Sequence, residues 1–332
     1  MIISRTPFRI SFFGGGTDYP IWYCDHGGRV LGTTIAQYGY CICRGQAPLS
    51  PHTYTLRYAK SEYVDTREAI DHRVIRESLR YLDIQEGIDL TYNADLPSMA
   101  GLGSSSTFTV SLLHALYTLK GQAVSPHQLT LDAVHLEQDV LEEAVGSQDQ
   151  TFAAYGGLRC IEFGPEERSW IQVRRVVLPP GRSKDLERHL LLVYTGKQRS
   201  AAAIAAHQIR QTKDRASQLA AMDRVLSAAL EHLTDPTADL SLFGHHLNQT
   251  WALKKQLTDQ ISTPDLDHLY DRALEAGAIG GKLLGAGGGG FFLFFARPDD
   301  HETIRTALDP HPCLPVVFDR SGSTIVYQDE TS

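Results

Sequence analysis

A glycine-rich stretch that ends in three consecutive serines constrains this chain more than any other segment. It spans residues 97–107 and lies between a probable strand pattern at residues 88–94 and a helical pattern at residues 107–119. Glycine lets the backbone approach an anion closely, and the first N–H groups of a helix have no partners within the helix. The stretch therefore predicts a phosphate-binding loop. The alternative is a solvated loop in which a serine caps the helix.

Two common phosphate-binding signatures do not fit this loop. A P-loop requires Gly-Lys followed by Ser or Thr, whereas the pair Gly281-Lys282 is followed by Leu283. A dinucleotide-binding turn would need a third glycine where Ser106 stands. We therefore expect a phosphate-binding loop of a different type.

The length of 332 residues predicts two domains, at about 150 residues each. The composition, with 42% hydrophobic and 21% charged residues, is typical of globular proteins. The clearest break in the pattern lies at residues 179–183, which read Pro-Pro-Gly-Arg-Ser. We expect an N-terminal domain at residues 1–183 and a C-terminal domain at residues 184–332.

The net charge of −8 argues against nucleic acid or an anionic membrane as the main partner. The N-terminus has no apolar signal region, and no run of about 18 apolar residues occurs. The five cysteines follow no metal-binding spacing. We expect a cytoplasmic protein with a small-molecule partner. The sequence leaves the oligomeric state open, a homodimer included.

Three acidic residues are candidates for chemistry. Asp18 follows three glycines, so a close-approach loop can present it to a ligand hydroxyl, or the segment is a plain turn. Glu137 lies on an amphipathic helix at residues 127–143, and Asp149 follows it. On one unbroken helix they would lie about 18 Å apart. A helix end at Gly146, a natural C-cap, would let the chain fold back and bring them together. The alternative is two solvated acids at a helix end.

A second glycine-rich segment, residues 277–290, runs directly into the apolar segment 291–295. Four consecutive glycines before an apolar strand indicate a backbone that passes very close to another group. The alternative is a flexible hairpin turn.

Three segments, taken in order, resemble the GHMP kinases (galacto-, homoserine, mevalonate and phosphomevalonate kinases). The segment 97–107 is similar to the ATP-phosphate loop of that family, 280–290 to its C-terminal glycine motif, and 6–19 to its N-terminal sugar motif. Within the family, residues 8–18, 146–150, 194–201 and 280–290 most resemble D-glycero-D-manno-heptose 7-phosphate kinases. Galactokinases carry Glu-His where this chain has Gly15-Gly16, whereas L-fucose kinases share the glycine-rich version.

The resemblance implies an α+β, two-domain GHMP kinase fold. The N-terminal domain would be ribosomal-S5-domain-2-like and the C-terminal domain ferredoxin-like. It also implies a sugar kinase that uses ATP and Mg²⁺. The γ-phosphate of ATP would pass to the anomeric hydroxyl of D-glycero-D-manno-heptose 7-phosphate and give the 1,7-bisphosphate.

The resemblance also assigns roles to residues. Asp149 would be the catalytic acidic residue, with Arg9 beside it to keep it ionised, and Ser105 and Glu137 would hold Mg²⁺. The ATP-binding residues would be Pro97, Ala100, Gly101, Leu102, Gly103, Ser104, Ser105 and Ser106. The substrate-binding residues would be Gly15, Gly16, Thr17, Asp18, Gly196, Lys197, Arg199, Lys282, Gly287 and Gly288. Among these, Lys197, Arg199 and Lys282 are candidates to hold the 7-phosphate.

Three rival functions stay open on the sequence. One is a kinase that phosphorylates a free sugar, such as L-fucose or a related hexose, at C1. Another, from a different class, is a catalytically inactive relative that senses a ligand. The third is a mevalonate-type kinase, although the Gly-Gly-Gly-Thr-Asp turn at residues 14–18 favours a sugar. The presence of Arg9, Ser105, Glu137 and Asp149 argues against the inactive relative.

Overall fold

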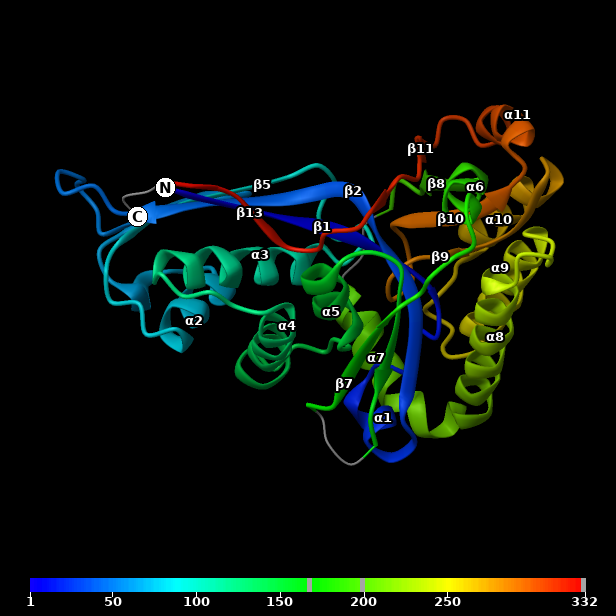
Figure 1. Cartoon of the computed structure of the whole chain (residues 1–332), viewed down its shortest axis with the longest axis horizontal. Coiled ribbons are helices and arrows are strands. Elements are labelled where there is room, and N and C mark those ends of the chain that lie inside the picture. The colour runs from blue at the N-terminus through cyan, green and yellow to red at the C-terminus, as the bar shows by residue number, and fades with distance from the viewer. Residues whose placement is uncertain (166–168, 198–200, 330–332) are drawn as a thin grey trace.

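The structure, a computed structural model, describes residues 1–165, 169–197 and 201–329. Figure 1 shows two sheets placed end to end, each covered by helices. The strands are β1 (Ile2–Phe13), β2 (Gly28–Gly45), β3 (Tyr54–Arg57), β4 (Ser61–Val64), β5 (Ile88–Ala94), β6 (Arg159–Phe163), β7 (Ile171–Arg175), β8 (Leu190–Tyr194), β9 (Ala278–Leu283), β10 (Phe291–Ala296), β11 (Cys313–Pro315), β12 (Phe318–Asp319) and β13 (Thr324–Gln328).

The helices have the following bounds. They are α1 (Pro20–His26), α2 (Arg73–Tyr81), α3 (Ser104–Leu119), α4 (Pro126–His135), α5 (Gln148–Tyr155), α6 (Arg182–His189), α7 (Ala201–Gln211), α8 (Ala216–Thr234), α9 (Ser241–Lys255), α10 (Pro264–Glu275) and α11 (His301–Ala307). One π-helical turn, Leu136–Val140, continues α4. Within the described ranges, every helix is too short or too polar to cross a membrane.

The first sheet is built on β1 and β2, which pair antiparallel along most of their length. β5 pairs with one part of β2 and β6 with another, so the long strand β2 serves two neighbours. β3 runs parallel to β5, and β4 forms the edge. The helices α2 to α5 cover one face of this sheet, with α3 directly against β1 and β2 (Figure 1).

The second sheet is antiparallel, in the order β11-β8-β10-β9. Every residue of β10 is buried, and this strand pairs with β8 on one side and β9 on the other. A central strand that is covered on both faces explains the continuous apolar run that precedes Arg297. Helix α9 packs against β9 and β10.

The two sheets share a hydrophobic core. Phe243 of α9 makes edge-to-face contacts with Phe12 and Phe13 of β1, at centroid distances of 5.2 and 5.1 Å. The buried Lys282 of β9 donates from Nζ to the backbone oxygens of Ser11 and Phe12, both at 2.9 Å. The two halves are therefore joined through their interiors as well as through the chain between them.

The end of the chain returns to the first sheet. β12 pairs with β2, and β13 pairs with β1. The amino group of Met1 lies 2.6 Å from Oδ2 of Asp329, so the two ends of the described chain lie side by side (Figure 1). The division into residues 1–183 and 184–332 stays a prediction.

Two helical regions of the chain are interrupted. Residues 67–82 form a 3₁₀ turn and then α2 from Arg73, because Ile70 between them has an extended backbone. The helices α7 and α8 are separated by a 3₁₀ turn. The helices α1 and α6 were not expected, although Pro20 at the start of α1 is a typical first helical residue.

Glycine in β9 allows close packing of this strand against α9. A Cβ added to Gly280 would lie 2.0 Å from the backbone oxygen of Gly244, whereas a Cβ at Gly45 would have no neighbour within 4 Å. We expect Gly280→Ala to lower the free energy of unfolding by about 1–3 kcal/mol or more, because α9 must move away from the sheet. Urea unfolding measures the effect. The control Gly45→Ala should change stability by less than about 0.5 kcal/mol, and equal effects of the two substitutions would contradict this packing.

Candidate active site

A cavity of about 460 Å³ lies where the two sheets meet. Its wall combines the second half of β1, the loop before α1, the loop of residues 97–107 (the serine loop), the start of α5 and the loop that follows β9. Segments from both halves of the chain therefore form one cavity.

The serine loop places a helix N-terminus at this cavity. Helix α3 begins at Ser104 rather than at Thr107, and Gly103 before it has a left-handed backbone with φ 80°. Gly101 has φ 79°, a conformation that favours glycine. Ser104, Ser105 and Ser106 thus form the first turn of α3, and all three line the cavity. Free N–H groups, hydroxyls and the helix dipole together favour an anion here.

The other predicted residues of this loop have structural contacts. The backbone oxygen of Ala100 accepts a hydrogen bond from the N–H of Phe291, and that of Leu102 accepts one from the N–H of Arg9, both at 3.1 Å. These two bonds tie the loop to both sheets. Pro97 is exposed and lies outside the cavity wall.

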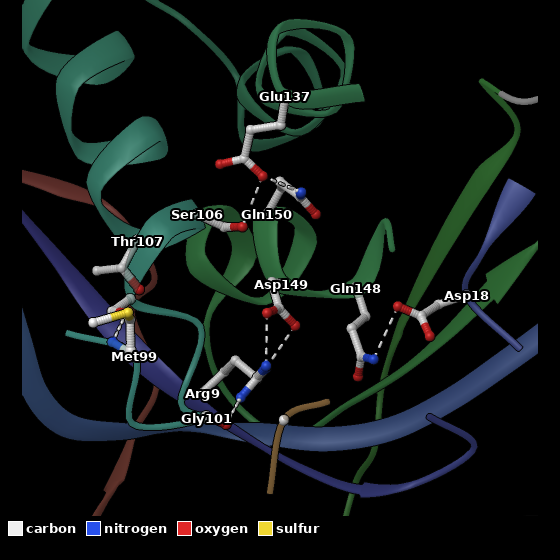
Figure 2. A network of polar contacts seen from close by, with 12 residues as sticks. Arg9, Asp18, Met99, Gly101, Ser106, Thr107, Glu137, Gln148, Asp149 and Gln150 are labelled. Atoms are coloured by element: carbon white, nitrogen blue, oxygen red, sulfur yellow. Dashed lines mark hydrogen bonds and ion pairs between the residues drawn. The ribbon is translucent and has the colours of Figure 1, made fainter. Parts of the chain in front are cut away.

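Arg9 and Asp149 form a bidentate ion pair in the cavity wall. Nε and Nη2 of Arg9 donate to the two carboxylate oxygens of Asp149 at 2.7 and 2.6 Å (Figure 2). Nη1 donates to the backbone oxygen of Gly101 at 2.7 Å. Arg9 is 4% exposed, so its guanidinium is fixed between the serine loop and the first turn of α5.

Asp149 reaches the cavity because helix α4 ends well before it. Helix α4 ends at His135, a π-helical turn follows, and Glu142 has a left-handed backbone with φ 55°. Helix α5 then begins at Gln148. The predicted helix over residues 127–143 is therefore too long at its end, but the predicted break before Asp149 is present.

Gly146 has a different role from the C-cap that the sequence indicates. Its φ is not positive, and no helix ends there. A Cβ at this position would lie 1.9 Å from Oδ2 of Asp18. Glycine is required because the loop before α5 passes in direct contact with Asp18.

Glu137 is fully buried behind the serine loop. Its Oε2 accepts hydrogen bonds from Ser106 Oγ, at 2.9 Å, and from the side-chain amide of Gln150 (Figure 2). Among the described residues its Oε1 has no hydrogen-bond partner. Burial raises the pKa of Glu137 to about 7, although these hydrogen bonds oppose the shift. The hydroxyl that reaches Glu137 is that of Ser106, while Ser105 is exposed to the cavity.

The carboxylate of Glu137 and the hydroxyls of Ser105 and Ser106 are oxygen groups that fit a magnesium ion. Carboxylate and hydroxyl oxygens are ligands of Mg²⁺, which in kinases keeps several waters and takes only one or two protein ligands beside phosphate oxygens. The unpartnered Oε1 of Glu137 leaves a carboxylate oxygen free for such an ion. The described residues contain no cluster of three or more His, Cys, Asp or Glu side chains that could hold a metal by themselves.

Asp18 is a buried carboxylate in the cavity wall. It accepts hydrogen bonds from the N–H of Gly16 and from the side-chain amide of Gln148, both at 2.9 Å. Figure 2 shows the bond from Gln148. Burial raises the pKa of Asp18, and the nearby charge of Asp149 adds to this shift. Gly15 and Gly16 also line the cavity, whereas the Thr17 hydroxyl donates to backbone oxygens within the protein.

Of the predicted phosphate anchors within the described residues, Lys197 lies outside the cavity wall and Lys282 lies in it. Lys197 forms a surface ion pair with Asp265, and Arg199 lies outside the described residues. Gly196, Gly287 and Gly288 are not part of the cavity wall, and the N–H of Gly288 donates to the backbone oxygen of Ile261. Lys282 does line the cavity, although it also donates to β1 as described above.

Several residues of the wall were missed by sequence reasoning, and two of them carry polar contacts at its centre, Gln148 and Lys254. Gln148 holds Asp18, and Lys254 of α9 is a buried lysine that lines the cavity. Lys254 follows Leu247 and Trp251 at intervals of seven and three residues, on the buried side of the helix. A lysine in such an apolar stripe is the signal that could have found it.

Two models of one protein family match this chain, one in each half. The model of the GHMP kinases N terminal domain matches residues 68–157, and the model of the GHMP kinases C terminal domain matches residues 226–311. The D-glycero-alpha-D-manno-heptose 7-phosphate kinase of Campylobacter jejuni is 30% identical over 326 residues, which cover 92% of this chain and 93% of that protein.

Two further similarities are more distant. The bifunctional fucokinase/GDP-fucose pyrophosphorylase of Arabidopsis thaliana is 24% identical over 92% of this chain, which spans 31% of that longer protein. The crystal structure of a D-glycero-D-manno-heptose 1-phosphate kinase from Bacteroides thetaiotaomicron superposes with a TM-score of 0.76 at 22% identity, and covers 99% of this chain and 100% of that one. This structural likeness concerns the fold.

The buried carboxyl of Glu137 gives a testable dependence of stability on pH. Its pKa is about 7 in the folded protein and about 4.5 when exposed, so its contribution to stability is complete below pH 4.5 and is lost as pH rises to 7. Glu137→Gln removes this loss, on the order of 3 kcal/mol. We expect its unfolding free energy relative to wild type to increase between pH 4.5 and pH 7.5.

Chemical denaturation at several pH values, with EDTA present, measures this difference. Glu86→Gln, which removes an exposed carboxylate, serves as the control. If the wild-type and Glu137→Gln curves run parallel with pH, the carboxyl of Glu137 is not held in its neutral form.

Proposed function

The chain belongs to the GHMP kinases, and from this premise we propose that it phosphorylates D-glycero-D-manno-heptose 7-phosphate at the anomeric hydroxyl. The phosphoryl group would come from the γ-position of ATP, and the product would be the 1,7-bisphosphate. As a member of this family the chain has the two-domain fold of mixed helices and sheets that the sequence predicted. It is an ATP-dependent sugar kinase that acts on a hydroxyl group.

One observation carries the proposed reaction. The paired Arg9 and Asp149 face the same cavity as the first turn of α3. Phosphoryl transfer needs little covalent chemistry from the protein, because positioning and charge stabilisation supply most of the catalysis. A helix N-terminus for the phosphates and a fixed carboxylate for the attacking hydroxyl are the parts that this reaction requires.

In the proposed mechanism Asp149 accepts a hydrogen bond from the anomeric hydroxyl and takes its proton or orients it for attack. Arg9 fixes the Asp149 carboxylate and ties it to the serine loop. Ser105 and Glu137, with Ser106 between them, would hold Mg²⁺, which neutralises charge on the β- and γ-phosphates when bound. The N–H groups at the start of α3 would bind phosphate oxygens.

The acceptor is proposed from the heptose 7-phosphate kinase relative, because that protein is similar along almost its whole length. Asp18, held by Gln148 and Gly16, would accept hydrogen bonds from sugar hydroxyls. The wall also contains the cations Lys254 and Lys282, which suit an acceptor that already carries a phosphate.

A second candidate acceptor is a free sugar such as L-fucose, phosphorylated at C1. The similarity to the fucokinase of the bifunctional plant protein favours it, since that match also extends over 92% of this chain. A ligand-sensing role without catalysis is disfavoured, because the ion pair of Arg9 and Asp149 is present and well placed.

Asp149→Asn should lower kcat by about 10²- to 10⁴-fold, because the amide cannot accept the hydroxyl proton. A steady-state assay of ADP release with Mg²⁺ measures this effect. Asp271→Asn, at an exposed position of α10, should retain wild-type activity. Unchanged turnover in the Asp149→Asn enzyme would remove Asp149 from the proposed mechanism.

A panel of acceptors decides the substrate. We expect turnover with D-glycero-D-manno-heptose 7-phosphate and at least tenfold lower kcat/KM with free heptose, L-fucose, galactose, mannose and mevalonate. The same assay of ADP release measures turnover with each acceptor. Higher kcat/KM on a free sugar would select the second candidate, and absence of turnover with intact ATP binding would point to the sensor.

A further inference from the structure

Lys254 is a buried lysine of the cavity wall to which the proposed mechanism assigns no specific contact. It lies on α9, is 5% exposed and lines the cavity. Its Nζ donates to the backbone oxygens of Leu283 and Gly285, at 2.8 and 2.6 Å. An ammonium group has three N–H donors. The hydrogen bonds of the described residues use two of them, which leaves one donor for a ligand.

The charges around Lys254 favour a bound anion. Arg9 from β1 and Lys282 from β9 are the nearby cations, and Asp18 is the nearby carboxylate. The charge of Arg9 is offset by Asp149, whereas neither lysine has a carboxylate in direct contact among the described residues. Burial, reinforced by Arg9, lowers the pKa of Lys254 to about 7. An anion in the cavity would relieve this crowding of positive charge.

The position of Lys254 indicates which kind of anion would bind in the cavity. Gly285, to which Lys254 donates, packs directly on the serine loop, since a Cβ at Gly285 would lie 2.6 Å from the Cα of Gly101. The carbonyl of Gly101 in turn accepts from Arg9, which holds Asp149. Lys254 therefore belongs to the same junction as the proposed phosphate cradle and the proposed catalytic carboxylate.

We propose that Lys254 is a phosphoryl-binding residue, whose third N–H donates to a phosphoryl oxygen of a ligand in the cavity. The proposal rests on the proposed kinase reaction. The phosphoryl group is either the γ-phosphate of ATP or the phosphate that the acceptor already carries. Both present the same oxygen chemistry to an ammonium group, and binding measurements separate them.

The neighbouring lysine provides a matched control. Lys255 lies on the same turn of α9, but its Nζ forms a surface ion pair with Asp267 at 3.0 Å and lies over the ring of Trp251. It is not part of the cavity wall. Lys254→Met and Lys255→Met remove the same group from inside and outside the cavity.

Isothermal titration calorimetry tests the proposal with three ligands: AMP-PNP with Mg²⁺, D-glycero-D-manno-heptose 7-phosphate and free heptose. We expect Lys254→Met to weaken one of the two phosphorylated ligands by about 10- to 100-fold, the loss of one charged hydrogen bond. Free heptose should bind equally well, and Lys255→Met should change no affinity by more than twofold. Loss confined to AMP-PNP assigns the γ-phosphate, and loss confined to heptose 7-phosphate assigns the phosphate of the acceptor.

The proposal is overturned if Lys254→Met binds both phosphorylated ligands within twofold of wild type, or if it weakens free heptose equally. Failure of the proposed acceptor is a separate result: wild-type protein would then bind AMP-PNP but neither heptose. In that case the nucleotide titration alone decides on Lys254.

A second measurement does not depend on the stability of Lys254→Met, which leaves the carbonyls of Leu283 and Gly285 without their lysine donor and could unfold the protein. The ¹³Cε signals of lysine in labelled wild-type protein report the pKa of each amine, and Lys254→Arg assigns the signal. We expect a phosphorylated ligand to raise the pKa of Lys254 by at least one unit and free heptose to leave it unchanged. A pKa that neither phosphorylated ligand moves would refute the proposal.

Discussion

The side chain and backbone of Arg9 hold the cavity together. The guanidinium bonds both oxygens of Asp149 and the carbonyl of Gly101, while the backbone N–H bonds the carbonyl of Leu102. One residue of β1 thus fixes the serine loop and the first turn of α5 relative to each other. A planar group with several fixed donors is needed for this, and lysine could not replace it. The proposed phosphate cradle and the proposed catalytic carboxylate keep their spacing because both are bonded to the same buried cation.

Close backbone contacts set the rest of the geometry. Gly146 lets the loop before α5 touch Asp18, and Gly285 lets the loop after β9 touch Gly101. A side chain at either position would separate the segments that form the wall of the cavity. Gly146 and Asp18 both belong to the first half of the chain, whereas the contact of Gly285 with Gly101 joins the two halves. Together these contacts place carboxylates and buried cations in the wall of one cavity.

The sequence predicted much of this arrangement where local patterns were strong. The bounds of β5 agree with the strand expected at residues 88–94, and the glycine and serine spacing predicted the serine loop. Contacts between segments that lie far apart in the sequence could not be predicted from local patterns. The pairing of Ser106 with Glu137 depends on a π-helical turn, and the burial of Lys254 depends on the second sheet. Of the lysines that the sequence proposed as phosphate anchors, Lys282 lines the cavity and Lys197 forms a surface ion pair, whereas Lys254, which also lines the cavity, was not proposed.

The central claim is that the cavity transfers the γ-phosphoryl group of ATP to the anomeric oxygen of a phosphorylated heptose. Correlation of ³¹P and ¹H signals in the reaction mixture tests it directly, because it identifies the carbon that carries the new phosphate. The account predicts a new phosphorus signal coupled to the anomeric proton, with the signal of the 7-phosphate retained. A new phosphate coupled to any other proton, or release of inorganic phosphate without a sugar ester, would contradict it.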